Sequence, residues 1–320
     1  MPKVSAIMAL YNTPYECLDK TMKSILTQSF EDFELIVVDD ASSIDYKEYF
    51  EKFNDRRIKY RKLAKNSGSG VARNSGMLMA QGEYLAICDS DVVYMKDRFK
   101  LQVEYLDSHE DISVLGGAYK FSNKTSVAKL VTSDDDLKIS LLFNSPFANP
   151  VMMLRRKFFI DNNLFYSEML NFGKDYALWA NAMCKKAKMA NMKDVLMVCA
   201  RRKGQLPKQN DKKQEEALKV VYKNILIKIG MKFSDKDVDM QLQIYQQNFK
   251  GIKREDLSFW FYRLIEANKK SMILPENELL KYRDYVLDRH EKINNRIFKM
   301  KIGNKNFCIQ KPFKFVIENR

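Results

Sequence analysis

Short apolar runs, two of which end in aspartate, constrain the fold of this chain most strongly. The runs are VSAIMAL at residues 4–10, ELIVVDD at 34–40 and EYLAICD at 83–89. Runs of this length that are rich in Val, Ile and Leu are typical of buried strands. Apolar residues at helical spacing, from Leu18 to Leu26, separate the first two runs. The order strand, helix, strand indicates a βαβ unit.

The remainder of the chain divides into a mixed part and a helical part. Up to about residue 205, the pattern predicts further strands at 57–63, 112–121, 149–156 and 195–202, and helices at 70–82 and 172–187. Strands that alternate with helices favour an α/β fold with a parallel sheet. After residue 205 strand signals nearly vanish. There the pattern predicts helices at 215–230, 255–270 and 275–290, and one opened by a capping box of Ser234 and Asp237.

The positive charge of the chain is concentrated near its C-terminus. The net charge is +14 at pH 7, and residues 201–320 carry +13 of it while residues 1–200 carry +1. A basic region of this kind suggests an anionic partner, which could be nucleic acid, a membrane surface or a charged acceptor. A lysine-rich solvated surface explains the excess equally well.

The sequence predicts neither a membrane span nor a disulfide framework. No apolar run approaches the roughly 18 residues that a spanning helix needs, and the opening residues lack the features of a signal peptide. We therefore expect the chain to stay in the cytoplasm. Its five cysteines are widely spaced and form no CxxC pair, which indicates neither disulfides nor a zinc site.

Acidic residues gather at the predicted strand ends. In parallel sheets, ligands bind at the carboxyl ends of the strands, where Asp39, Asp40, Asp89 and Asp91 are expected to lie. Two carboxylates two positions apart on a strand point to the same side, about 6 to 7 Å apart, so they repel unless a cation or donors lie near them. An isolated DSD sequence is more often a solvated turn.

Three segments resemble, in order and spacing, the opening of the family 2 glycosyltransferases. They are VSAIMALYN, TMKSILTQSFEDFELIVVDDASSID and NSGSGVARNSGMLMAQGEYLAICDSDVVY. The family consists of inverting enzymes that use nucleotide-diphosphate sugars. Its GT-A fold is a Rossmann-like mixed, mostly parallel sheet flanked by helices. The resemblance covers roughly residues 3–205.

The resemblance implies two domains. A GT-A catalytic domain would span residues 1–205, with a nucleotide-binding half at about 1–110 and an acceptor half at about 111–205. Residues 206–320 would form a basic, mainly helical C-terminal region.

The resemblance also implies a nucleotide site. Tyr11 and the backbone near Ala9 would flank a uracil ring, and Asp40 would accept a hydrogen bond from the ring N–H. Arg73 would reach uracil or phosphate oxygens. Ala9 stands where relatives often carry Pro or Thr, which matters little because a backbone contact suffices.

In this family CDSD is the DxD motif. Asp91 would ligate a Mn²⁺ or Mg²⁺ ion that bridges the two phosphates, and Asp89 would face the ribose or the water shell of the metal. Hard oxygen ligands together with a diphosphate suit these ions. Ser90, between them in the same nucleotide-binding segment, is expected to turn its side chain away.

The segment NFGKDYALW carries the residue that resembles the catalytic base. Asp175 matches the aspartate that takes the proton of the acceptor hydroxyl, while Lys174 replaces the glutamate that is commoner in the family. Lys174 could lower the pKa of Asp175, meet an anionic acceptor or point to solvent. Asp175 could also be only a carboxylate that complements the helix dipole.

A second departure follows the last predicted strand. Many relatives have an Arg-x-His loop that closes on the diphosphate, whereas this chain reads ARRKGQ, with Lys203 in place of the histidine. Arg201 and Lys203 could supply positive charge there, or the loop could simply be basic and exposed. His109 and His290 match no motif.

The resemblance therefore predicts an inverting transfer of a sugar from a UDP-sugar to a hydroxyl of a glycan or lipid-linked saccharide. We expect a role in bacterial surface polysaccharide synthesis at the inner face of the cell membrane. The basic C-terminal region would dock to anionic lipid or to a phosphorylated acceptor, and its helices could form a homo-oligomer. Its aromatic run at 259–264 could be a sugar platform or a membrane-facing patch, but helical aromatics are more often core.

Two other functions remain open at this point. A sugar-phosphate nucleotidyltransferase would share the fold, but it typically needs a glycine-rich basic loop after the first strand, where this chain reads LYNTPYECL. A nucleic-acid-binding protein would explain the basic region, but the chain has no recognised nucleic-acid module.

Overall fold

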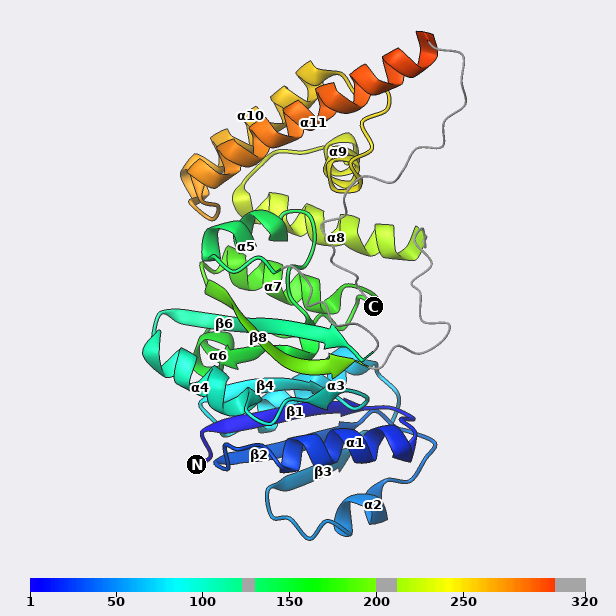
Figure 1. Ribbon diagram of the computed structural model, residues 1–320, viewed down its shortest axis with the longest axis vertical. Coiled ribbons are helices and arrows are strands. Elements are labelled where there is room, and N and C mark those ends of the chain that lie inside the picture. The colour runs from blue at the N-terminus through cyan, green and yellow to red at the C-terminus, as the bar shows by residue number, and fades with distance from the viewer. Residues whose placement is uncertain (123–129, 200–211, 303–320) are drawn as a thin grey trace.

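The protein is built on one mixed sheet with helices on both faces and a stack of helices at one end (Figure 1). The structure is a computed structural model that describes residues 1–122, 130–199 and 212–302, with side chains up to residue 294. The sheet has eight strands in the order β3-β2-β1-β4-β7-β6-β8-β5. The strands are β1 (Val4–Leu10), β2 (Phe33–Asp39), β3 (Ile58–Lys62), β4 (Tyr84–Asp89), β5 (Val93–Tyr94), β6 (Ile112–Phe121), β7 (Met153–Arg155) and β8 (Lys188–Cys199).

Helices separate most of these strands and then form the C-terminal part of the described chain. Those of the sheet region are α1 (Tyr15–Leu26), α2 (Lys47–Glu51), α3 (Ser69–Met79), α4 (Arg98–Ser108), α5 (Asp134–Leu141), α6 (Arg156–Asp161) and α7 (Lys174–Cys184), with a 3₁₀ turn at Asn149–Val151. Those that follow are α8 (Lys212–Ile229), α9 (Asp235–Gln246), α10 (Arg254–Ser271) and α11 (Glu276–Ile302).

The first four strands along one side of the sheet are parallel. Strand β1 lies between β2 and β4 in parallel register. Because side chains alternate between the faces of a strand, Ile7 packs in the cluster that contains α3, and Met8 packs in the cluster that contains α1. The register pairs Ala9 with Asp89 and Leu10 with Asp39. The three strands therefore end at one edge of the sheet, as their sequences predict.

The other half of the sheet is mixed. The three-residue strand β7 runs antiparallel to both β4 and β6, β8 is parallel to β6, and β5 is antiparallel to β8. The strand expected at 149–156 is therefore much shorter, because its first residues form the 3₁₀ turn. The strand expected at 195–202 begins earlier, at Lys188, and residues 200–202 lie outside the described part of the chain.

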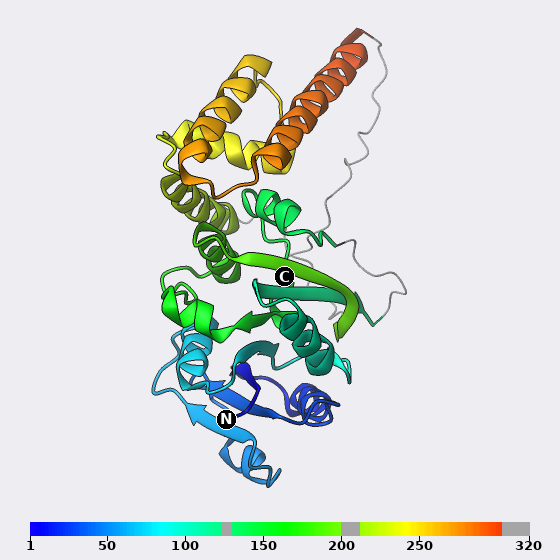
Figure 2. The ribbon, with the colours of Figure 1, turned by 90° about the vertical axis from the view of Figure 1, so that its left-hand side faces the viewer.

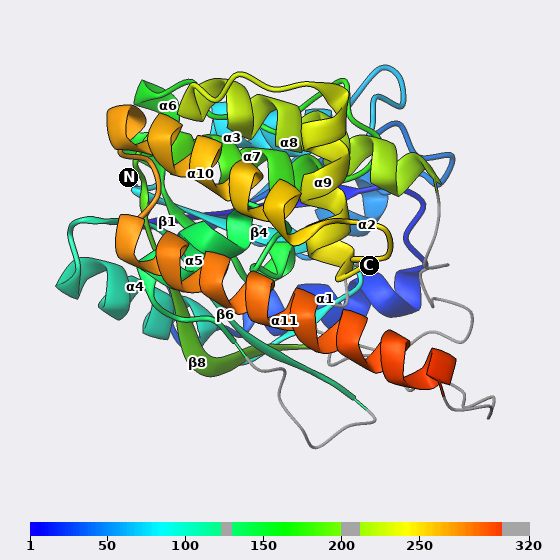
Figure 3. The ribbon, with the colours of Figure 1, turned by 90° about the horizontal axis from the view of Figure 1, so that it is seen from above.

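The C-terminal helices pack on α5 and α7 rather than on the sheet (Figures 2 and 3). One apolar cluster runs from Ile7 in β1 through Trp179 in α7 to Leu287 in α11. The capping box of Ser234 and Asp237 is present at the start of α9, as predicted. The predicted domain boundary near residue 205 lies outside the described residues, so the division of the chain into two domains stays a prediction.

The aromatic run at 259–264 is split between core and surface. Trp260 and Phe261 are buried, whereas Phe259 and Tyr262 are 60% and 58% exposed. The core interpretation therefore holds for the first pair only. Within the described residues, no helix is long and apolar enough to cross a membrane.

Candidate active site

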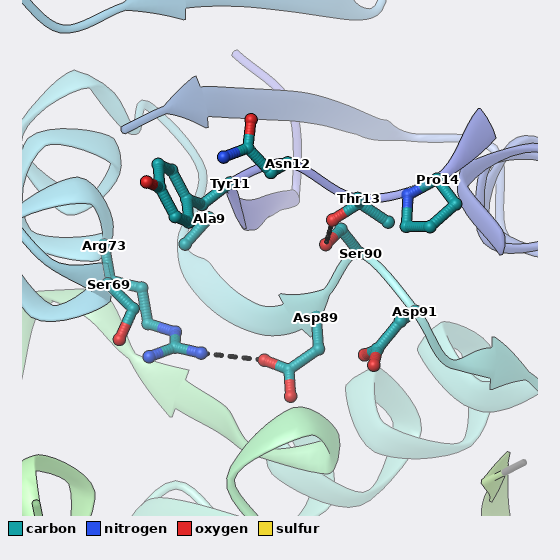
Figure 4. A pocket seen from close by; sticks show the side chains of 10 residues that line it. All are labelled: Ala9, Tyr11, Asn12, Thr13, Pro14, Ser69, Arg73, Asp89, Ser90 and Asp91. Atoms are coloured by element: carbon teal, nitrogen blue, oxygen red, sulfur yellow. Dashed lines mark hydrogen bonds and ion pairs between the residues drawn. The ribbon is translucent and has the colours of Figure 1, made fainter. Parts of the chain in front are cut away.

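A pocket opens at the carboxyl ends of β1 and β4, beside the first turn of α3 (Figure 4). Several of the residues chosen from the sequence line it together. The lining residues are Ala9, Tyr11, Asn12, Thr13, Pro14, Ser69, Arg73, Asp89, Ser90 and Asp91. The parallel register produces this gathering, because it places Ala9 directly opposite Asp89.

The segment after β1 forms one wall of the pocket. Tyr11 is 53% exposed, so its ring is accessible to a flat ligand. Two hydrogen bonds fix the backbone of this segment. The Asn12 N–H donates to Ser42 Oγ at 3.0 Å, and the Tyr46 hydroxyl donates to the Thr13 carbonyl at 2.6 Å. These bonds fix the backbone on either side of an accessible ring.

Arg73 and Asp89 form an ion pair across the floor of the pocket. Arg73 Nη2 lies 2.8 Å from Asp89 Oδ1, and Figure 4 shows the two side chains turned toward each other. The Arg73 guanidinium also lies 5.5 Å from the ring centroid of Tyr166, close enough for a cation–π attraction. Arg73 is therefore held between a carboxylate and an aromatic face.

The two carboxylates of the CDSD segment have different surroundings. Asp89 is paired with Arg73, while Asp91 lies on the other side of Ser90 (Figure 4). Ser90 is buried, with its Oγ 2.6 Å from Thr13 Oγ1. The Ser90 hydroxyl thus connects the segments that follow β1 and β4.

Asp40 has a structural role that the sequence does not reveal. It is 2% exposed and is not among the residues that line the pocket. Its two carboxylate oxygens accept hydrogen bonds from the backbone N–H groups of Ser67 and Gly68, each at 2.7 Å. Asp40 therefore fixes the loop that leads into α3. Its contact with a uracil ring stays a prediction.

Asp175 lies in the first turn of α7, where the charges of the pocket residues Arg73 and Asp89 act on its carboxyl. It is half-buried, and burial raises the pKa of its carboxyl above the ordinary value of 3.8. A hydrogen bond from the Tyr176 backbone and the positive charge of Arg73 act in the opposite direction, and the charge of Asp89 adds to the increase. A carboxylate with a raised pKa is suited to accept a proton near neutral pH.

Helix α3 is joined to the segment before α7 by a reciprocal pair of hydrogen bonds. Asn74 Nδ2 donates to the Tyr166 carbonyl at 2.9 Å, and the Tyr166 N–H donates to Asn74 Oδ1 at 2.8 Å. The Tyr166 hydroxyl lies 2.9 Å from Asn149 Oδ1. These contacts link α3 and the 3₁₀ turn to the segment that leads into α7.

Sequence analysis missed several of these residues. Asn12, Thr13 and Ser69 line the pocket, and their positions after a strand or at the start of a helix could have identified them. Asn74 and Tyr166 carry no local signal, since they are 92 positions apart. Arg201 and Lys203, which were expected near a diphosphate, lie outside the described residues.

The described side chains do not form a complete metal cage. Among them, no group of three or more His, Cys, Asp and Glu residues is arranged to hold a metal ion. Any cation at the CDSD segment would therefore need ligands other than a cluster of these side chains.

Comparison with known proteins identifies the family. The sequence pattern described as Glycosyl transferase family 2 matches residues 5–167, just over half of the chain. This chain belongs to glycosyl transferase family 2. The match includes every pocket residue and confirms the predicted enzyme class, so neither a nucleotidyltransferase nor a nucleic-acid-binding function is retained.

Two relatives of this glycosyltransferase show how far the sequence similarity extends. The uncharacterized glycosyltransferase MJ1057 of Methanocaldococcus jannaschii is 30% identical over 207 residues, which cover 61% of this chain and 70% of MJ1057. The succinoglycan biosynthesis protein ExoO of Rhizobium meliloti is 28% identical over 196 residues, which cover 57% of this chain and 56% of ExoO. The chain thus matches little more than half of ExoO, and 31% of a relative from Rickettsia conorii.

The solved structures confirm the fold. TarS 1–349 of S. aureus, in a crystal structure with UDP-GlcNAc, superposes with a TM-score of 0.61 at 20% identity and covers 93% of this glycosyltransferase and 92% of TarS 1–349. The likeness extends over the helical C-terminal part. The predicted GT-A fold with a helical C-terminal region is therefore confirmed.

The link between α3 and the segment before α7 yields a stability prediction. Asn74→Ala removes both hydrogen bonds to Tyr166 and leaves a buried N–H and a buried carbonyl without partners. We expect the free energy of unfolding to fall by about 2–4 kcal/mol in urea denaturation, because each unpaired group costs about 1–3 kcal/mol.

The control for this prediction is Asn162→Ala. Asn162 Nδ2 donates a single hydrogen bond, to the Phe158 carbonyl at 2.9 Å, and the side chain is less buried. Its loss should cost about 1 kcal/mol or less. Equal losses in the free energy of unfolding for the two variants would show that the pair of hydrogen bonds at Tyr166 contributes no more than a single one.

Proposed function

We propose that this protein transfers a sugar from a UDP-sugar to a hydroxyl of a glycan or lipid-linked acceptor, with inversion and with the help of a divalent cation. One observation carries the proposal. An accessible tyrosine, a half-buried arginine and two carboxylates share one pocket at the strand ends, and the half-buried Asp175 lies within reach of their charges.

The donor would bind with its base near Tyr11 and its diphosphate near Arg73. The exposed ring of Tyr11 and the backbone of Ala9 offer a surface for a flat base. Arg73 Nε is buried and donates no hydrogen bond in the described part of the chain. An oxygen of the nucleotide sugar could therefore accept a hydrogen bond from it. The UDP-GlcNAc bound to TarS supports a UDP-sugar as the donor.

The residues at the CDSD segment fit a Mn²⁺ or Mg²⁺ ion. Two carboxylates, Asp89 and Asp91, line the pocket, and such ions are commonly held by one or two carboxylates together with substrate phosphates. By the resemblance to the DxD motif of the family, Asp91 would be the direct ligand, while Asp89 pairs with Arg73. The ion would neutralise charge on the departing diphosphate.

Asp175 would act as the general base. Its carboxylate would take the proton of the acceptor hydroxyl while that oxygen attacks the sugar carbon. A single attack from the face opposite the diphosphate inverts the configuration of that carbon. Burial holds the pKa of Asp175 above its ordinary value, and the positive charge of Arg73 limits the increase. The carboxylate can therefore be ionised before attack and still bind a proton afterwards.

The acceptor and the cellular site are proposed on broader grounds. The name of ExoO, a succinoglycan biosynthesis protein, supports a role in making a polysaccharide. The +13 charge of residues 201–320 supports peripheral contact with anionic lipid at the inner face of a membrane. The helices of this region would also provide the surface for a homo-oligomer.

The direct test is a screen for UDP release from UDP-sugars, with and without Mn²⁺. We expect release to require the cation, to stop in EDTA and to return with Mn²⁺ or Mg²⁺. Asp91→Asn should lower kcat by about tenfold or more and raise the Mn²⁺ concentration needed for half-maximal rate, because it removes a charged ligand. The exposed Asp161→Asn serves as the control and should change neither value. Full activity of Asp91→Asn at low Mn²⁺ would contradict the metal role.

The base is tested by Asp175→Asn. The amide keeps the shape of the side chain but cannot take the proton, so kcat should fall by about 10²- to 10⁴-fold. UDP binding, measured by calorimetry, should stay within about threefold, since a base contributes to the reaction rather than to donor affinity. The exposed Glu168→Gln is the matched control. Retention of normal kcat by Asp175→Asn would assign the base to another residue.

The raised pKa of Asp175 gives a pH prediction. A base must be ionised, so kcat should fall as pH decreases through the pKa of Asp175, and this limb should lie above the ordinary value of 3.8. Arg73→Gln should move the limb to still higher pH, because the charge of Arg73 lowers the pKa of Asp175. A pH–rate profile measured at saturating donor and acceptor checks both statements. An unmoved limb in Arg73→Gln would show that the titrating group is not Asp175.

A further inference from the structure

Lys174, the first residue of α7, extends away from its own helix toward the loop before α3. A Cβ atom placed on Gly68 would lie 2.8 Å from Lys174 Nζ, and one placed on Gly70 would lie 3.0 Å from Lys174 Cδ. The side chain therefore crosses the start of α3. Because neither glycine has a Cβ atom, Gly68 and Gly70 leave room for the Lys174 side chain.

Among the residues that the structure describes, the ammonium of Lys174 forms no ion pair. In the described ranges, no carboxylate lies within 4.0 Å of it, and it makes no hydrogen bond. Burial lowers its pKa, the charge of Arg73 lowers it further, and the charge of Asp40 acts in the opposite direction. The oxygens of Asp40 already accept hydrogen bonds from Ser67 and Gly68.

The contrast with Arg73 indicates what Lys174 lacks. Both cations lie beside the start of α3, but Arg73 has Asp89 at 2.8 Å. A half-buried cation is costly to leave without a counter-charge. The first backbone N–H groups of α3 add further positive potential beside it. Among the described residues, the charge of Asp40 acts on Lys174, but its two oxygens already accept backbone hydrogen bonds. This corner of the site can therefore accept further negative charge.

The pocket is next to this corner. Ser69, which follows Gly68 directly, lines the pocket, and so does Arg73 one turn later. The four-carbon stem of a lysine is flexible and carries donors that rotate freely. Lys174 does not itself line the pocket, so its ammonium would have to move from Gly68 to meet a ligand there.

We propose that Lys174 binds an anionic group of the nucleotide sugar. This inference rests on the proposed use of a UDP-sugar donor. The anionic group is either an oxygen of the diphosphate or a carboxylate on the sugar, and both would form a charge-assisted hydrogen bond with the ammonium. Lys174 then helps to determine which donor is accepted, in addition to its place beside the base Asp175.

The experiment measures binding of three ligands to the full chain by calorimetry in the presence of Mn²⁺. The ligands are UDP, UDP-glucose and UDP-glucuronic acid. Lys174→Met removes the charge and keeps the length, Lys174→Gln is a second neutral variant, and Lys174→Arg keeps the charge. Lys185→Met, an exposed lysine just after the same helix, is the matched control. Thermal melts establish that each variant is folded.

Both neutral variants should weaken binding by about 10- to 100-fold, as expected for the loss of a hydrogen bond to a charged group. Weaker binding of all three ligands assigns the diphosphate as the partner of Lys174. Weaker binding of UDP-glucuronic acid alone assigns the sugar carboxylate. Lys174→Arg should retain most of the affinity, and Lys185→Met all of it.

Two results would overturn the inference, and they are distinguishable. If the unaltered protein binds UDP but neither Lys174→Met nor Lys174→Gln weakens any ligand, Lys174 has no role in donor binding and the proposed function stands. If the unaltered protein binds none of the three ligands, the proposed UDP-sugar donor is wrong and the role of Lys174 fails with it.

Discussion

The ion pair between Arg73 and Asp89 connects the parts of the molecule on which the site depends. It joins α3 to the end of β4, with Arg73 Nη2 2.8 Å from Asp89 Oδ1. The same guanidinium lies over the ring of Tyr166, which belongs to the second half of the fold. The charge of Arg73 also reaches Asp175 and Lys174 and lowers the pKa of both. The like charges of Asp89 and Asp175 repel each other, and the positive charge of Arg73 offsets this repulsion.

The order of the strands explains why this pair forms at all. Strand β4 lies directly beside β1 in parallel register, so the segments that follow both strands leave the sheet at the same edge. Helix α3 crosses back along the sheet and begins at that edge, with Ser69 and Arg73 in its first two turns. The order and register of the strands therefore bring these segments to one edge of the sheet.

The sequence predicted the parts of this arrangement that depend on local signals. The strand at 4–10 and the capping box at Ser234 appear as expected, because apolar periodicity and capping chemistry act over a few residues. The antiparallel direction of β7 and the pairing of Asn74 with Tyr166 were not predicted. Both are set by contacts between segments that are distant in the sequence. Neither a three-residue strand nor a single asparagine carries a local sequence pattern that predicts such contacts.

The helical C-terminal part packs against α7, the helix that carries Asp175, rather than standing apart from it. Asn224 Nδ2 in α8 donates to Asn181 Oδ1 in α7 at 2.6 Å, and the Tyr222 hydroxyl donates to the Phe143 carbonyl at 2.6 Å. The apolar core continues without interruption from the sheet into these helices. The ring of Tyr222 in α8 also lies 6.4 Å from that of Tyr176, the residue after Asp175, so α8 packs against the first turn of α7. Whatever the basic region binds, the described helices already have a part in holding the proposed base in place.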